Sequence, residues 1–222
     1  MTRRWAFATI GLAAGFSGVA VLFTILTGVA LSIAEAALVV VPMIVAVVVA
    51  RRAPRAVVGE VWRVARAGLL SGFAASLVYD ATRTVLSILD PSPYNPFEAI
   101  RRFGLGSVPS SAGPTAVMAA GLAIHFINGS SFGVIYVAFA GRHVQTLRAA
   151  LVSGLVWGLT LEFIQSIFYP GWLHITTVLR EFLVISGLGH VMYGLTLGLG
   201  VRWLLRRESP RETVGTPPGY RV

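Results

Sequence analysis

The sequence predicts an all-α integral membrane protein with six transmembrane helices. The 222-residue chain is 55% hydrophobic and only 12% charged, which leaves too little polar surface for a water-soluble globule. Its apolar runs are long enough to cross a bilayer, and arginines cluster at their ends. The absence of cysteine excludes disulfides, thiolate metal ligands and iron–sulfur clusters.

Residues 1–50 predict an N-terminal transmembrane hairpin. The run from Ala6 to about Leu26 is too long for the apolar region of a signal peptide, so we expect a retained helix. A second span covers 29–50. The following segment, RRAPRAVVGEVWRVAR at 51–66, carries five arginines and predicts a basic cytoplasmic connector.

Residues 67–205 predict a four-helix membrane core with spans at 67–88, 116–140, 149–168 and 181–205. The tail at 206–222 is polar and rich in proline, which predicts disorder on the cytoplasmic side.

The outer loop at 89–115 should contain a short helix of its own. Asn95 can cap its start, Glu98 completes a capping box, and Gly104 can end it. Aromatic residues such as Phe103 predict that this helix lies on the membrane interface.

The arginines predict the orientation of the chain. Six spans put both termini on one side, and most arginines flanking the spans fall there: Arg3, Arg4, Arg51, Arg52, Arg55, Arg63, Arg66, Arg142, Arg148, Arg202, Arg206 and Arg207. Excess positive charge marks the cytoplasmic side, so we expect the inner membrane of a bacterial or archaeal cell, with both termini cytoplasmic. The basic balance then indicates contact with anionic lipids and not with nucleic acid.

Two segments of the predicted core share one pattern. RAGLLSGFAASLVYD, which ends at Asp80, aligns without a gap on RAALVSGLVWGLTLE, which ends at Glu162. Downstream of each carboxylate comes HxxxGxxxG, formed by His125, Gly129 and Gly133 and then by His190, Gly194 and Gly198. The sequence therefore predicts two pseudo-symmetric helical-hairpin repeats in parallel orientation, with the glycines at close helix contacts.

The four ionisable residues of the repeats should lie at one depth. Asp80 and Glu162 each follow an inner arginine by fourteen residues, about 21 Å at the helical rise of 1.5 Å per residue. By the same rise, His125 and His190 lie about 25 and 18 Å from the arginines at the inner ends of their own helices. Because ionisable groups in the hydrocarbon region are costly unless paired or hydrated, these residues are functional-site candidates.

Neighbouring side chains could support such a site. Arg83 lies one helical turn after the first carboxylate and could pair with it. Gln165 holds the matching place after the second carboxylate but cannot neutralise it. Asn128 and Tyr193 each follow a histidine by three residues and could orient an imidazole or hold a water. As ordinary interhelical hydrogen-bonding residues, they would need no site.

The residue set permits three kinds of ligand. Asp80, His125, Glu162 and His190 could bind a divalent transition metal such as Zn, Fe or Mn. The two histidines alone could ligate haem b. The four groups could also exchange protons without any metal. The sequence has no nucleophile elbow, phosphate loop, HExxH motif or dinucleotide fingerprint, so catalysis has no positive support.

The motifs around 147–207 resemble the YagU-like family of small bacterial inner-membrane proteins. The resemblance rests on LRAALVSGLVWGLTLEFIQSIFYPGW and GHVMYGLTLGLGVRWLLRR, with HFINGSSFGVIYVAFAG as a third patch, and the matching residues are His125 and His190. It implies a helical bundle and a link to acid resistance, and it leaves the first two spans as an addition.

These observations favour a membrane protein that binds a metal ion or protons at a buried histidine and carboxylate site, for transport or for an acid or metal response. The opposing hypothesis is a structural or assembly subunit. In that case the histidines satisfy interhelical hydrogen bonds, and the outer loop PSPYNPFEAIRRF docks a membrane protein partner or a second copy of the chain.

Overall fold

The computed structural model of the chain describes residues 2–90, 94–141 and 143–207. Within these ranges the regular elements are helices, with no strand, and six of the helices are long and apolar enough to cross a membrane. The predicted all-α fold with six membrane spans is therefore confirmed. The predicted tail at 206–222 lies outside the described residues beyond Arg207.

The membrane spans are formed by α1 (Arg3–Thr27), α2 (Leu31–Arg52), α3 (Arg55–Leu89), α5 (Pro114–Ala140), α6 (Leu147–Leu173) and α7 (Leu179–Arg207). The short helix α4 (Glu98–Ser107) lies between α3 and α5, and a 3-10 turn, η1 (Thr176–Val178), precedes α7. Local signals end and start the spans. Gly28 ends α1 in the left-handed conformation, at φ 72°, and the Thr146 hydroxyl accepts the backbone N–H of Ala149 at the start of α6.

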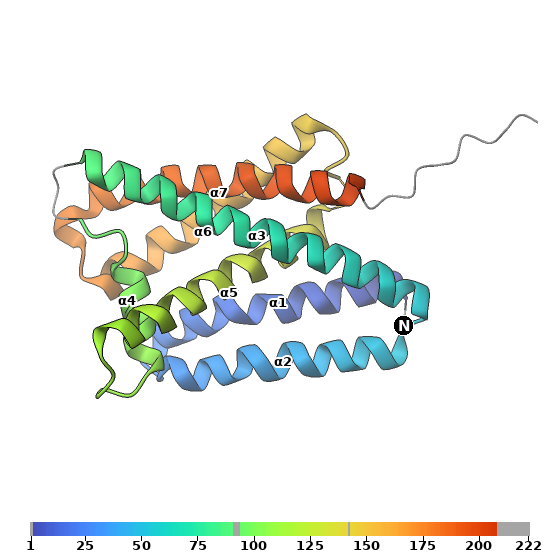
Figure 1. Cartoon of the computed structure of the whole chain (residues 1–222), viewed down its shortest axis with the longest axis horizontal. Coiled ribbons are helices and arrows are strands. Elements are labelled where there is room, and N and C mark those ends of the chain that lie inside the picture. The colour runs from blue at the N-terminus through green and yellow to red at the C-terminus, as the bar shows by residue number, and fades with distance from the viewer. Residues whose placement is uncertain (1, 91–93, 142, 208–222) are drawn as a thin grey trace, which may run out of the picture.

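The helix α3 holds the bundle together. It packs against α5 on one side and α7 on the other, and α6 packs against α7. The helix α1 lies between α2 and α5 (Figure 1). Residues of α3, α5, α6 and α7 therefore meet inside the bundle, with α1 covering one side of them.

The predicted basic connector at 51–66 is mostly helix and not a separate element. After a break near Pro54, α3 starts at Arg55 and runs without interruption for 35 residues. At 1.5 Å per residue this length is about 52 Å, far more than the hydrocarbon core of about 30 Å. The prediction separated connector from span because hydropathy changes at about Ala67, whereas backbone hydrogen bonding continues through the change.

Glycines bring the core helices into close contact in two places. In the first, Gly68 and Gly72 of α3 face Gly133 and Gly129 of α5, so closely that an added Cβ would overlap the opposing backbone. In the second, Ala150 and Gly154 of α6 meet α7 at Gly198 and Gly194 in the same way. The predicted packing glycines thus all lie at helix contacts, and the contacting pairs occupy matching positions in the two aligned segments. That the hairpins are repeats stays a prediction.

The helix α4 packs into the bundle, contrary to the prediction of an interfacial helix. Phe103 is buried, and Gly104 lies against the backbone of Val117 in α5 instead of ending the helix. The capping box is also wrong, because Asn95 Oδ1 accepts the backbone N–H of Phe97 before the helix starts. Small residues where α4 crosses α5 allow a close contact that the aromatic pattern does not reveal.

The Glu98 carboxylate ties α4 to the following helices. Hydrogen bonds from Arg101, at 2.8 Å, hold the pKa of Glu98 below its usual value, and Arg102 adds a second pairing. Arg102 also donates to the backbone carbonyl of Trp172 in α6. This arrangement links the charge of one partly buried carboxylate to the packing of α4.

We expect acid to loosen α4. Because the folded-state pKa of Glu98 is lowered, its stabilisation is present above the ordinary glutamate pKa of about 4.3 and is lost as the pH falls through the lowered value. The fluorescence emission of Trp172 should change between about pH 5 and pH 3. This emission is identified as the part of the tryptophan signal that is lost in Trp172→Phe. Glu98→Gln should flatten that change, and an unaltered profile in this variant would contradict the assignment.

Candidate functional site

The first buried pair joins α6 to α7. His190 Nδ1 lies 2.7 Å from Glu162 Oε2, and both side chains are about nine-tenths buried, with 10% and 12% of their surfaces exposed. The same nitrogen lies 3.1 Å from the backbone oxygen of Ser186, one turn earlier in α7. Since both neighbours are acceptors, Nδ1 carries a hydrogen, and Nε2 is the ring nitrogen that Glu162 does not contact.

The Ser186 hydroxyl completes this pair. It donates to Glu162 Oε2 at 2.7 Å and accepts from Gln165 Nε2 at 2.9 Å. Glu162 Oε1 is buried and has no hydrogen-bond partner among the described residues. The carboxylate is therefore held through one oxygen, and no arginine is among the side chains that hold it.

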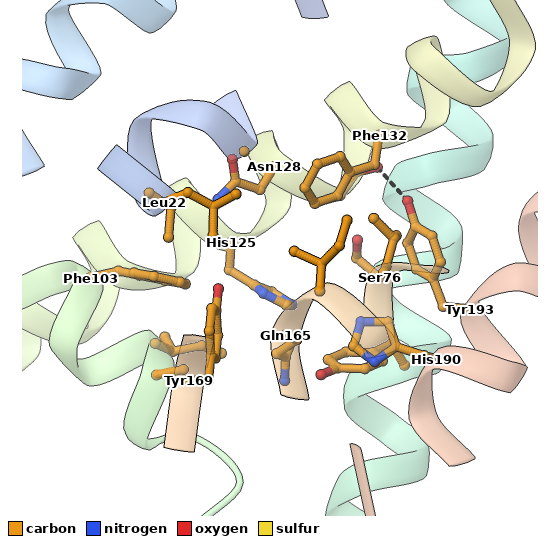
Figure 2. A pocket seen from close by; sticks show the side chains of 18 of the residues that line it. Leu22, Ser76, Phe103, His125, Asn128, Phe132, Gln165, Tyr169, His190 and Tyr193 are labelled. Carbon is orange, nitrogen blue, oxygen red and sulfur yellow. Dashed lines mark hydrogen bonds between the residues drawn. The ribbon is translucent and has the colours of Figure 1, made fainter. Parts of the chain in front are cut away.

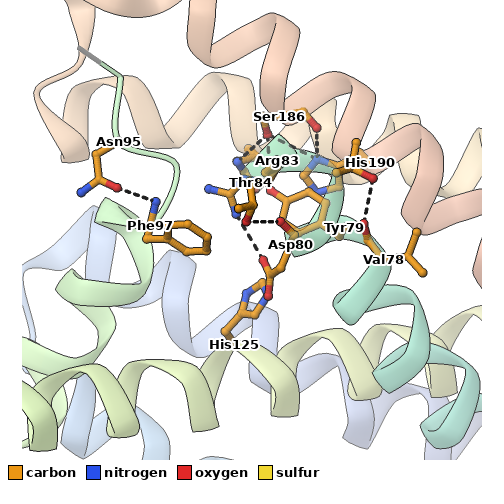
Figure 3. Close-up of polar contacts among 12 residues, drawn as sticks. Val78, Tyr79, Asp80, Arg83, Thr84, Asn95, Phe97, His125, Ser186 and His190 are labelled. Carbon is orange, nitrogen blue, oxygen red and sulfur yellow. Dashed lines mark hydrogen bonds and ion pairs between the residues drawn. The ribbon is translucent and has the colours of Figure 1, made fainter. Parts of the chain in front are cut away.

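The second buried pair joins α3 to α5. Asp80 Oδ2 lies 3.0 Å from His125 Nε2, and Arg83 Nη1 lies 3.7 Å from Asp80 Oδ1 (Figure 3). The Arg83 guanidinium is 4.7 Å from the centre of the Tyr79 ring and hydrogen-bonds the Tyr94 hydroxyl, whose pKa burial raises to about 12. The predicted Asp80–Arg83 ion pair thus exists, and it compensates the charge of Asp80.

The two pairs differ in one chemical detail. Asp80 contacts Nε2 of its histidine, whereas Glu162 contacts Nδ1 of its own. The imidazole nitrogens that face the carboxylates are therefore different atoms in His125 and His190, although the two histidines hold matching places in the aligned segments.

The four residues form two pairs and not one cluster. The Tyr79 ring stands between the histidines, with ring centroids 5.9 Å from His125 and 4.7 Å from His190. In the described part of the chain, no group of three or more histidine, aspartate or glutamate side chains could hold a metal ion. A single metal bound by Asp80, His125, Glu162 and His190 therefore has no support in the structure.

Both histidines line one cavity of about 270 Å³ (Figure 2). Its polar wall includes Arg83, Asn128 and Gln165. Phe103 and Phe132 are among the apolar residues of its other walls. The cavity is thus a largely apolar chamber in which two imidazoles share one space.

Part of the cavity wall comes from the N-terminal hairpin. Gly15 and Gly18 of α1 line the cavity, and an added Cβ on Gly18 would press on the Phe132 ring. Val19 of α1 and Ile164 of α6 also line it, although 57% and 36% of their surfaces are exposed. The cavity therefore reaches residues of α1 and α6 that are partly exposed on the surface of the bundle.

The predicted supporting residues have different roles. Gln165 donates to Ser186 and not to Glu162. The Tyr193 hydroxyl donates to the backbone oxygen of Gly129 at 2.7 Å, so it links α7 to α5 and orients no imidazole. Asn128 is buried and lines the cavity, and its Oδ1 has no hydrogen-bond partner among the described residues.

Sequence reasoning missed Ser186 and Tyr79. Ser186 lies four residues before His190, which places it one helical turn away on the same face, so that spacing could have revealed it. Tyr79 precedes Asp80 directly and hence points to a different side of α3. Its position between the histidines depends on how α3 packs against α7, which no local pattern encodes.

Comparisons with protein-family models, curated proteins and solved structures find no match to this chain. The resemblance to the YagU-like family stays a prediction.

Proposed function

We propose that this membrane protein binds and exchanges protons at the Glu162–His190 pair, whose histidine lines the same cavity as His125. The observation that carries the proposal is the burial of this pair with no arginine in an ion pair with Glu162 among the described residues. In the other pair, formed by Asp80 and His125, Arg83 compensates the charge of the carboxylate. The arginine-rich helix ends support a cytoplasmic position for the end of the bundle where α1 begins and α7 ends.

Charge balance places one proton on the pair. Asp80 and Arg83 cancel each other, so the first pair is neutral when the His125 ring is uncharged. Glu162 and His190 are neutral together only when they hold one proton in addition to the hydrogen on Nδ1. Because an uncompensated charge in the membrane interior costs several kcal/mol, we infer that the pair retains this proton.

The geometry also restricts how the proton leaves. It can leave from Nε2 of His190, since Nδ1 is engaged with Glu162 and with the Ser186 backbone. Its loss would leave one negative charge buried beside Tyr79. Release is therefore favourable only when another positive charge, such as a second proton, enters the cavity, so we infer exchange and not simple dissociation.

The test is the charge state of the His190 ring. Protein labelled with ¹⁵N in its histidine rings and held in detergent micelles at pH 7 should give one imidazolium signal that disappears in His190→Gln. Glu162→Gln should convert that ring to the neutral form, because the carboxylate no longer favours its charge.

The matched control is Asp80→Asn, which alters the other pair and should leave the His190 signal in place. A neutral His190 ring in the unmodified protein would overturn the proposal. So would an imidazolium that persists in Glu162→Gln. Loss of partner binding in the histidine variants, with every ring neutral in the unmodified protein, would favour the structural-subunit hypothesis instead.

A further inference from the structure

A second cavity, which neither His125 nor His190 lines, lies at the end of the bundle where α1 begins and α7 ends. It measures about 750 Å³ and lies among α1, α3, α5 and α7. Five arginines line it, with Glu60 as the acidic residue of its lining: Arg3, Arg4, Arg63, Arg202 and Arg206. With one carboxylate against five guanidinium groups, the lining carries a formal charge of +4.

Two of these arginines already have partners. Arg3 makes a two-point ion pair with Glu60, with Nε 2.7 Å from Oε2. Arg206 donates to the backbone oxygen of Gln145. Only Arg3 is paired with a carboxylate, so the charges of the other four arginines have no carboxylate partner among the cavity residues, and Arg4, Arg63 and Arg202 also lack the carbonyl contact of Arg206.

Arg202 gives the most specific indication of a ligand. Its Nε lies buried in the last turns of α7, and it has no hydrogen-bond partner among the described residues. A buried donor without a partner costs about 1–3 kcal/mol, more when it is charged. An anion in the cavity would remove that cost, because guanidinium groups bind phosphate oxygens through two parallel hydrogen bonds.

The rest of the cavity wall selects the kind of anion. Phe7, Val64, Val137 and Leu205 add apolar surface between the arginines. Phe139 also lines the cavity while 58% of its surface is exposed, so the cavity continues onto the outer face of a membrane span. A free phosphate needs no such wall, whereas a lipid places its phosphate among the arginines and its acyl chains along the span.

We propose that this cavity, which goes beyond the proton site, binds the headgroup of an anionic phospholipid. The formal charge of +4 favours a head with two phosphodiester groups over one with a single phosphate. The volume lies within the range of about 300–1,000 Å³ that is typical of ligand sites.

The test is lipid binding by the detergent-purified, delipidated protein. In native mass spectrometry, lipids with two phosphodiesters should remain bound, and choline phospholipids, which have no net charge, should not. The variant Arg63→Gln/Arg202→Gln should lose at least tenfold in apparent affinity. Its far-UV circular dichroism should be that of the unmodified protein, and its melting temperature without lipid should be no lower.

The control is Arg51→Gln/Arg52→Gln, which removes the same charge from the exposed end of α2 and from outside the cavity. An equal loss in both double variants would overturn the proposal, because it would show general attraction between the lipid and a basic surface. Competition by inorganic pyrophosphate as strong as that by the lipid would also overturn it, since the site would then recognise free phosphate.

Discussion

Replacing His190 with leucine should destabilise the folded protein by about 3–5 kcal/mol, because the variant leaves Glu162 buried without its partner. The loss can be measured as a lowered midpoint of unfolding in detergent micelles. The double variant Glu162→Leu/His190→Leu should recover most of it, since removing both partners leaves no buried charge.

The other pair provides the control for this prediction. His125→Leu should cost less than His190→Leu, because Arg83 still compensates Asp80 after the imidazole is gone. Equal losses in the two single variants would show that the histidines act through packing alone. That outcome would also remove the charge argument behind the proposed proton site.

The second large effect should come from the glycine contact between α6 and α7. Gly154→Ala would place a Cβ against the backbone oxygen of Gly194, and neither backbone can move without separating the helices. Overpacking of this kind costs about 1–3 kcal/mol. Gly72→Ala, at the matching contact between α3 and α5, should cause a similar loss in the same unfolding measurement.

Two glycines outside the contacts serve as controls. Gly187 of α7 and Gly59 of α3 would have nothing within 4 Å of an added Cβ. Alanine at either position should stabilise the protein by about 0.5–1 kcal/mol, through the lower entropy of its unfolded backbone. Destabilisation by Gly187→Ala as large as that by Gly154→Ala would mean that the glycines matter for flexibility and not for contact.

The sequence predicted well whatever depends on spacing along one helix. Apolar runs gave six spans, and residues four apart gave the packing glycines, because a helix repeats its faces every 3.6 residues. The common depth of the carboxylates and histidines follows from the helical rise, and each carboxylate does meet the histidine of its own hairpin.

What the sequence did not predict depends on contacts between helices. Depth alone cannot separate one cluster of four from two pairs divided by Tyr79, because the division follows from the rotation of α3 against α7. Which imidazole nitrogen faces a carboxylate depends on a side-chain rotamer. The burial of α4 depends on the glycines where it crosses α5, and those glycines match no interfacial pattern.

The wall that α1 gives to the histidine cavity changes how the chain divides into parts. Hydropathy separates an N-terminal hairpin from a four-helix core, yet Gly15 and Gly18 line the same cavity as His190. The two ends of the polypeptide are therefore both needed to form one chamber. The smallest unit able to enclose both imidazoles in this cavity therefore includes α1, so the first span belongs to the same packing unit as the four core helices.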